Sequence, residues 1–390
     1  MRKTILITLF AAIGALALAQ SNNVIKIATV SPLSGEQAAL GEMIKLGAQL
    51  AIEEAQPEFE KLGFKLELSP QDDQANPDVG VAVARRLVTD PDVLAVVGHL
   101  NTGVAIPSSE VYKDYQLPMV SPANTGPAVT DRCYLNIDRL VGRDDVQGPA
   151  GAEFAVKELG AKRIFIVHDK TTYGQGIAEQ FKKKAEELGA KVVGFVGTEE
   201  KSNFQALILQ MKAKKPDFVY FGGIYNQGAV LLKQMRERGI KATFMGPDGL
   251  DSSKFVEIAG EAAKGAYYTT VAGPPDRYPK AAAMVKKFKE RFGKTPESFA
   301  IYGYDSAKVV IKALKDFISF AHRKPTRAEL SMLIRQTTME GVTGSIAFDY
   351  KGDRKKADYF VVHLKEAKYP GEVVKVISFP APASVCKAIR

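Results

Sequence analysis

The stretch that decides the fold of this 390-residue chain is residues 99–127, HLNTGVAIPSSEVYKDYQLPMVSPANTGP. It follows a short apolar run, residues 93–97 (VLAVV), whose length suits a buried strand. A helix is expected over residues 104–115. A second apolar run, residues 117–120, ends in the polar turn 121–126. The pattern predicts a β-α-β unit.

Both predicted strands of this unit end in small, hydroxyl-rich loops that carry Thr102 and Thr125. In open α/β sheets, ligands bind beyond the carboxyl ends of the strands. The start of a helix also offers free N–H groups and a partial positive charge, which suit a carboxylate. A purely structural alternative is that each threonine only caps a helix. Two such loops on successive strands favour a binding site.

The rest of the chain repeats this alternation of strands and helices, which indicates parallel sheets covered on both faces. In the first half, strands are expected at residues 24–30, 64–68, 93–97, 117–120 and 134–139, and helices at 38–56, 77–89 and 104–115. After a polar break at 141–145, strands are expected at 163–168, 191–195, 217–221, 242–245 and 265–271, and helices at 151–159, 175–188, 204–213, 229–238 and 252–259. The remaining helices are expected at 279–292, 299–321 and 327–336, and the remaining strands at 345–348, 359–364 and 373–377.

The helices after Pro275 bring no new parallel strands, so we expect them to cover the first sheet. The chain would then cross between two lobes near residues 141–145, 272–275 and 342–344, and several crossovers make a hinge. The predicted fold is α/β, with two Rossmann-like lobes whose parallel sheets are joined by a three-crossover hinge. The expected divisions are a first lobe of residues 20–142 and 273–343, a second lobe of 143–272 and 344–378, and a C-terminal tail of 379–390.

The first residues, MRKTILITLFAAIGALALAQ, have the three parts of a secretory signal peptide. Arg2 and Lys3 precede an apolar stretch, and Ala17-Leu18-Ala19 is a small-x-small cleavage site. The apolar part is shorter than the about 20 residues of a membrane span. We therefore expect cleavage after Ala19, which removes residues 1–19, and export of a soluble mature protein.

Charge and composition exclude some classes of partner. Hydrophobic residues make up 46% and charged residues 25% of the chain, which is typical of globular proteins. The formal net charge of +9 is spread over stretches of mixed sign such as residues 181–188 (FKKKAEEL). No dense basic block is interleaved with aromatic residues, so no nucleic-acid partner is expected.

The two cysteines, Cys133 and Cys386, are far apart in the sequence. Because export exposes thiols to an oxidising environment, we expect them to pair and to pin the C-terminal tail. Pairing requires that their Cα atoms come close, which a sequence does not show. Neither cysteine has a recognisable nucleophile context.

A secreted hydrolase is the main alternative from another class. Its carboxylates would have to come from Asp72-Asp73, Asp144-Asp145 and Asp248, but paired acids in loops are usually caps and turns. The histidines are dispersed, so no metal site is expected; they are His99, His168, His322 and His363. Nucleophile-elbow, phosphate-loop and dinucleotide motifs are missing from the sequence. We expect neither a catalytic residue nor a cofactor.

Several segments of the sequence resemble those of one protein family. They are residues 95–127, 164–176 (IFIVHDKTTYGQG), 217–223 (DFVYFGG), 244–249 (FMGPDG), 258–260 and 348–353 (FDYKGD). In this order, over about residues 25–364, they resemble the leucine/isoleucine/valine-binding proteins of bacterial ABC importers. The resemblance implies the type I periplasmic binding protein fold. It also implies a monomeric periplasmic receptor that delivers a branched-chain or aliphatic amino acid to a membrane permease.

The resemblance also implies how the ligand is held. The hydroxyl of Thr102 and the N–H groups of Ala123 and Thr125 would bind the α-carboxylate. The carbonyl of Ala123, the hydroxyl of Thr125 and the carboxylate of Asp248 would accept from the α-ammonium. Family members commonly have glutamate where this chain has Asp248, and a turn aspartate in Pro-Asp-Gly is the alternative interpretation.

The side-chain pocket of the family is apolar and aromatic. By resemblance, this chain would line it with Tyr173, Phe299, Leu100, Asn101, Leu40 and Ile224. The last two stand where a known member has tyrosines, so the cavity is expected to be wider unless Tyr225 fills it. An amide, urea, an aromatic amino acid or a carboxylate is the alternative ligand on the same fold.

Overall fold

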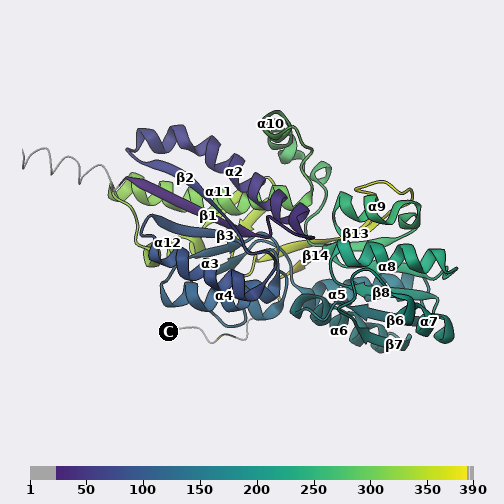
Figure 1. Cartoon of the computed structure of the whole chain (residues 1–390). Helices are drawn as coiled ribbons and strands as arrows, with labels where there is room; N and C mark the ends of the chain where they lie inside the picture. The colour runs from purple at the N-terminus through teal and green to yellow at the C-terminus, as the bar shows by residue number, and fades with distance from the viewer. Residues whose placement is uncertain (1–22, 384–385, 387–390) are drawn as a thin grey trace, which may run out of the picture.

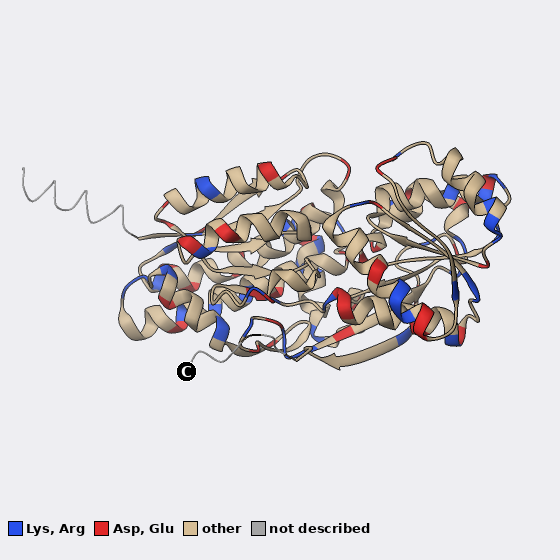
Figure 2. Cartoon of the chain, turned by 90° about the horizontal axis from the view of Figure 1, so that it is seen from below, with Lys and Arg blue, Asp and Glu red and all other residues tan. Residues whose placement is uncertain are grey.

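The computed structural model describes residues 23–383 and residue 386. The expected signal peptide and its cleavage site after Ala19 lie outside the described residues. Within the described part of the chain, no helix has both the length and the apolar character that a membrane crossing requires. The described chain forms two lobes that lie side by side, each a sheet flanked by helices (Figure 1). Basic and acidic residues are interspersed along the helices (Figure 2).

The first lobe is built on a parallel sheet with the strand order β2-β1-β3-β4-β5. Its strands are β1 (Val24–Ser31), β2 (Lys65–Asp72), β3 (Val93–Gly98), β4 (Met119–Ser121) and β5 (Ile137–Arg139). Its helices are α2 (Ala38–Lys61), α3 (Pro77–Thr89), α4 (Thr102–Asp114), α10 (Ala282–Phe292), α11 (Ser298–Ala321) and α12 (Arg327–Gln336). All six residues of β3 are buried, as expected of a central strand in a doubly covered sheet.

The late helices return to the first lobe, as the sequence predicted. Helix α11 runs beside α2 on this lobe, and α12 contacts β3 and β5. The approach of α2 and α11 depends on glycine, because a Cβ built on Gly47 would lie 1.9 Å from the carbonyl oxygen of Ala300. A Cβ on Gly303 would likewise lie 2.4 Å from the carbonyl oxygen of Ile44.

The second lobe has a sheet with the order β14-β13-β10-β9-β8-β6-β7, in which β13 and β14 are antiparallel to their neighbours. Its strands are β6 (Arg163–His168), β7 (Lys191–Gly197), β8 (Phe218–Gly222), β9 (Thr243–Gly246), β10 (Tyr267–Thr270), β13 (Lys356–His363) and β14 (Glu372–Pro380). Its helices are α5 (Asp144–Glu153), α6 (Thr172–Glu187), α7 (Gln205–Lys214), α8 (Tyr225–Glu237) and α9 (Ser253–Ala259).

Several details differ from the sequence-based expectation. The expected helix 151–159 is the end of α5 followed by the π-helical turn η2 (Phe154–Glu158), and β14 continues to Pro380, into the expected tail. The expected break at 141–145 overlaps the first turn of α5, where Asp144 and Asp145 favour a helix start. The expected strand 345–348 is β12 (Gly344–Ala347), which pairs with the unpredicted β11 (Thr338–Gly341) in a separate hairpin. The tight turn between them uses Gly344 at a φ of +92°.

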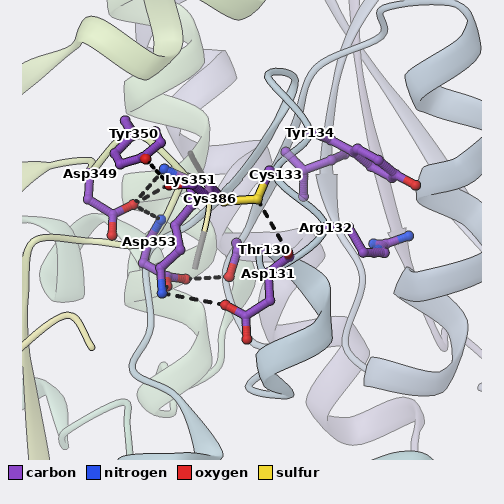
Figure 3. The surroundings of a disulfide bond; sticks show 12 residues. Thr130, Asp131, Arg132, Cys133, Tyr134, Asp349, Tyr350, Lys351, Asp353 and Cys386 are labelled. Atoms are coloured by element: carbon purple, nitrogen blue, oxygen red, sulfur yellow. Dashed lines mark hydrogen bonds and ion pairs between the residues drawn. A yellow bond between two sulfur atoms is a disulfide. The ribbon is translucent and has the colours of Figure 1, made fainter. Parts of the chain in front are cut away.

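The third crossover therefore lies later than expected. Because β11 contacts α11, the hairpin stays with the first lobe, and the chain reaches the second lobe only at β13. The crossing segment is residues 348–355 rather than 342–344. Cys133 and Cys386 form a disulfide beside this segment (Figure 3).

Candidate ligand-binding site between the lobes

Residues from both lobes meet around a buried cavity of about 20 Å³. The cavity is lined by Leu40, Leu100, Asn101, Ala123, Thr125, Tyr173, Ile224, Asp248, Gly249 and Phe299. All of these except Gly249 were predicted as site residues from the sequence. Thr102 is the one predicted ligand-binding residue outside this lining, and it lies directly behind the Thr125 loop.

The two threonines do not cap helices. Asn101, rather than Thr102, is the N-cap of α4, and its side chain caps no helical N–H. The Thr102 hydroxyl instead accepts the N–H of Gly126 at 3.1 Å. Thr125 Oγ1 is buried and faces the Asp144 carboxyl, but it forms no well-directed hydrogen bond within the described residues. Because a poorly paired buried hydroxyl is costly, this position favours a bound polar ligand.

The loop 121–126 is held rigidly by side chains around it. Ser121 Oγ accepts the N–H groups of Ala123 and Asn124 at 3.3 and 3.2 Å. The Asn124 side chain donates to the carbonyl of His99 at 2.9 Å, which ties this loop to the end of β3. The buried guanidinium of Arg139 donates to the carbonyl of Gly126 at 2.8 Å. The two loops at the strand ends thus form one pre-organised wall.

The opposite wall comes from the second lobe. The Tyr173 hydroxyl, on the first turn of α6, donates to Asp248 Oδ1 at 2.8 Å and accepts the N–H of Gly249 at 2.9 Å. Asp248 begins the 3₁₀ turn η3 (Asp248–Leu250) after β9. Burial raises the pKa of Asp248 to about 6, although the hydrogen bond from Tyr173 opposes that shift.

Asp144, expected from the sequence to be only a loop acid, has a buried carboxyl. Its backbone N–H donates to the carbonyl of Thr125 at 3.0 Å, which places it behind the ligand loop. Its carboxyl faces the Thr125 hydroxyl, but among the described residues its Oδ1 forms no well-directed hydrogen bond. Burial, and then the nearby Asp248, raise the pKa of Asp144 well above its usual value. The only feature of the sequence that could have pointed to Asp144 as a site residue is its position at the first crossover.

Two carboxyl groups near one buried cavity favour a cation. A buried charge needs a partner of opposite sign, and like charges close together disfavour each other's ionisation. A ligand ammonium would satisfy both Asp248 and Asp144, while the hydroxyl and N–H groups of the first-lobe wall suit a carboxylate. The arrangement fits a small zwitterion with an aliphatic side chain.

The cavity is small in this arrangement of the lobes. Leu40 and Ile224 close it, and a volume of about 20 Å³ holds little more than one water. Tyr225 does not fill the cavity, since its hydroxyl donates to the carbonyl of Glu36 at 2.6 Å across the lobes. A ligand of amino-acid size therefore requires the lobes to move apart before it binds.

Polar contacts at the rim join the two lobes in this closed arrangement. The Glu36 carboxylate pairs with Lys201 Nζ at 2.8 Å and accepts from Asn226 Nδ2 at 3.1 Å. Because Glu36 and Lys201 are 54% and 64% exposed, this ion pair contributes little by itself. The rim contacts are weak enough to break when the lobes separate.

No group of three metal-ligating side chains occurs within the described residues. The cavity also places no nucleophile beside a base. Its chemistry is that of binding a polar ligand between two lobes, which is the arrangement of a periplasmic solute receptor.

Comparison with known proteins gives the family. Residues 24–369 match the sequence profile of the periplasmic binding protein family, and the chain belongs to that family. It is 34% identical over 346 residues to the Leu/Ile/Val-binding protein homolog 2 of Brucella abortus, covering 88% of this chain and 91% of the relative. It is 35% identical over 357 residues to the leucine-, isoleucine-, valine-, threonine-, and alanine-binding protein of Pseudomonas aeruginosa, covering 90% and 94% of the two chains.

Solved structures support the fold. The leucine binding protein LivK of Thermotoga maritima superposes with a TM-score of 0.82 at 30% identity, covering 92% of this chain and 99% of that one. A solute binding protein of R. palustris in complex with benzoate has the same TM-score of 0.82 at 20% identity, covering 93% and 99%. The predicted type I periplasmic binding protein fold is confirmed.

Proposed function

We propose that this protein is the periplasmic receptor of an ABC importer, which captures a branched-chain or other aliphatic amino acid between its lobes and delivers it to a membrane permease. The named relatives that bind leucine, isoleucine and valine support the ligand class. The aliphatic side chains of Leu40, Leu100 and Ile224 in the cavity wall support an apolar ligand side chain.

The observation that carries the proposal is the buried carboxylate of Asp248 opposite the Thr125 loop. The ligand ammonium would bind Asp248, the carbonyl of Ala123 and the hydroxyl of Thr125, with Asp144 close behind. The α-carboxylate would bind the Thr102 hydroxyl and the N–H groups of Ala123 and Thr125. This pairing satisfies both charges of a zwitterion in a water-excluded site.

The proposal includes the mode of action. Residues 23–142 and 273–347 would move as one lobe, and residues 143–272 and 356–380 as the other, because the β11–β12 hairpin stays with the first lobe. The ligand would bind to the first lobe, and closure would bring Tyr173 and Asp248 onto it.

The closed receptor would be a monomer recognised by the permease, and it would use neither a cofactor nor nucleic acid. Its signal peptide would be removed after Ala19, and it would carry out no catalysis.

A receptor for an aromatic carboxylate is the second candidate, because a protein of the same fold holds benzoate. Benzoate has no cation for Asp248 and Asp144, so these carboxyl groups disfavour it.

A thermal-shift panel on refolded mature protein separates the candidates. It would contain the common amino acids, benzoate, urea and small amides. A ligand at a hundred times its Kd adds about 2.7 kcal/mol of stability.

We expect leucine, isoleucine or valine to raise Tm, with no shift from benzoate, urea or amides. A shift with benzoate alone would replace the proposed ligand and keep the receptor fold.

A further inference from the structure

The C-terminal tail connects the two lobes a fourth time. Strand β14 of the second lobe ends at Pro380, which pairs with Lys356 at the start of β13. From there the chain leads to Cys386, whose sulfur is bonded to Cys133 of the first lobe. The Cα atoms of the two cysteines are 5.9 Å apart, as in ordinary disulfides. A covalent path therefore returns to the first lobe in addition to the three peptide crossovers.

The tail lies along the third crossover, residues 348–355. The N–H of Ala381 donates to the carbonyl of Lys355 at 2.9 Å, and Lys351 Nζ donates to the carbonyl of Pro382 at 3.2 Å. The Tyr350 hydroxyl donates to the carbonyl of Cys386, close to the disulfide (Figure 3). We call residues 381–383, together with the disulfide-bonded Cys386, the tail strap.

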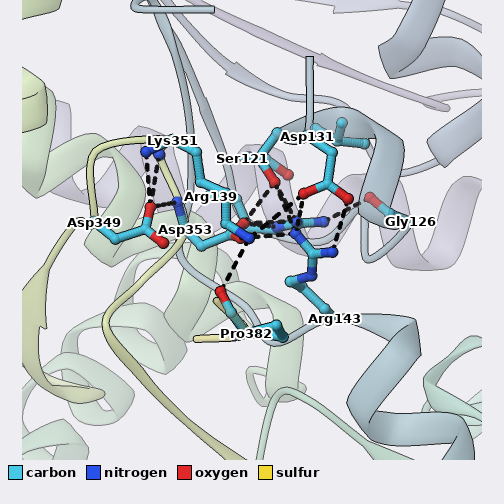
Figure 4. A network of polar contacts seen from close by, with 12 residues as sticks. Ser121, Gly126, Asp131, Arg139, Arg143, Asp349, Lys351, Asp353 and Pro382 are labelled. Carbon is cyan, nitrogen blue, oxygen red and sulfur yellow. Dashed lines mark hydrogen bonds and ion pairs between the residues drawn. The ribbon is translucent and has the colours of Figure 1, made fainter. Parts of the chain in front are cut away.

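The same crossover is anchored to the first lobe by a buried ionic network (Figure 4). The Asp353 carboxylate accepts from Arg139 Nη2 at 2.6 Å and from Arg143 Nη1 at 2.9 Å, and it pairs with Lys351 Nζ at 3.0 Å. Burial opposes ionisation of Asp353, but the two arginines hold its pKa well below its usual range.

The network also links two crossovers to each other. Arg139 ends β5, and Arg143 precedes α5, so both flank the first crossover. The N–H of Arg143 donates to the Tyr359 hydroxyl on β13 at 2.9 Å. The first and third crossovers thus form one hinge, and the disulfide bonds the tail strap to the first lobe beside it.

We propose that the tail strap, closed by the Cys133–Cys386 disulfide, restrains opening of the lobes and thereby favours the closed, ligand-binding arrangement. The six-residue step from Pro380 to Cys386 spans at most about 22 Å, so their separation is bounded. Without the covalent link, the open protein samples more interlobe angles. Closure then costs more conformational entropy, and ligand affinity falls. The effect on affinity rests on the proposed function, whereas the effect on opening does not.

The test compares the wild-type protein with Cys133→Ser, Cys386→Ser and the double variant. Small-angle X-ray scattering gives the radius of gyration of the ligand-free protein, and calorimetry gives the Kd for the amino acid found in the thermal-shift panel. The single variants are matched controls, because each breaks the same disulfide. If the disulfide itself is responsible, both single variants must show the same effect as the double variant. Reduction of folded wild-type protein with dithiothreitol adds two electrons and two protons to the disulfide, while the dithiol becomes its cyclic disulfide. This reduction covers the case in which a variant does not fold.

We expect a larger ligand-free radius of gyration and a three- to tenfold higher Kd without the disulfide, with unchanged scattering of the ligand-bound protein. A lower Tm with an unchanged radius of gyration and Kd would mean that the disulfide stabilises the attachment of the tail without restraining the lobes. Equal radii and Kd values within twofold, with the free thiols verified, would overturn the proposal. If wild-type protein binds no amino acid, the proposed function fails, and the ligand-free scattering still decides the role of the tail strap.

Discussion

The Tyr173 hydroxyl donates a 2.8 Å hydrogen bond to Oδ1 of Asp248, and both side chains are buried in the cavity wall. Because the same hydroxyl accepts the N–H of Gly249 at 2.9 Å, the tyrosine fixes the orientation of the carboxylate. Asp248 is therefore a positioned acceptor rather than a solvated turn residue. The shorter side chain, compared with the family's usual glutamate, still reaches the cavity.

Asp248→Asn tests the role of this charge. The amide keeps the size of the side chain and can still accept from Tyr173, but it leaves the ligand ammonium without a counter-charge. We expect a loss of about 2–4 kcal/mol of binding free energy, measured by calorimetry. Asp248→Glu should bind better than Asp248→Asn. Asp316→Asn on the exposed surface of α11 is the matched control and should bind like the wild type. Normal affinity of Asp248→Asn would make Asp248 a structural turn residue.

The raised pKa of Asp248 predicts a pH dependence. Its pKa in the folded protein is about 6, above its usual value of 3.8, so the ligand-free folded state binds the proton more tightly than the unfolded chain does. This stabilising contribution is complete below about pH 4 and is lost as the pH rises through about 6. A ligand ammonium needs the ionised carboxylate, so the ligand-induced rise in Tm should be larger at pH 7.5 than at pH 5. An equal rise at both pH values would contradict this assignment.

Asp144→Asn separates binding from stability. Burial and the neighbouring Asp248 disfavour a charge on Asp144, so a neutral amide should leave Tm of the ligand-free protein unchanged or higher. Removing the carboxyl beside the ammonium should weaken ligand binding about tenfold. Thermal unfolding and calorimetry on one preparation give both values. A large fall in Tm would identify Asp144 as a structural carboxylate instead.

Thr102→Ala tests the wall of the first lobe. The substitution removes the acceptor for the Gly126 N–H and the donor for the ligand carboxylate, which predicts a loss of about 1–3 kcal/mol of binding free energy. Thr102→Ser keeps the hydroxyl and should restore most of the affinity. Circular dichroism should show a folded protein in both cases, because the affected loop lies at the cleft. Tight binding by Thr102→Ala would remove this residue from the site.

Much of the site could be predicted because its residues lie at fixed places in a β-α-β pattern. Leu100, Asn101, Ala123 and Thr125 follow two buried strands, and the carboxyl ends of parallel strands meet at one edge of a sheet. The resemblance then added the residues that the second lobe contributes. Local pattern and family motif together placed nine of the ten lining residues.

The rest depended on tertiary contacts that no local pattern contains. In the sequence, Asp144 cannot be distinguished from an ordinary acidic residue of a loop or helix start. Only the tertiary structure shows that its carboxyl is buried and close to Asp248. The third crossover lies at residues 348–355 because the β11–β12 hairpin stays with the first lobe, and there Asp353 pairs with Arg139, more than two hundred residues away in the sequence. Tyr225, a candidate to fill the pocket, is instead held by the carbonyl of Glu36 in the other lobe.

The most direct test of the proposed function is calorimetry of refolded protein with leucine and with 4-methylpentanoate, which is leucine without its ammonium group. We predict that leucine binds and that 4-methylpentanoate binds at least a hundredfold more weakly, because Asp248 and Asp144 then face no cation. Equal affinity for the two, or binding of 4-methylpentanoate alone, would contradict recognition of a zwitterion between the lobes.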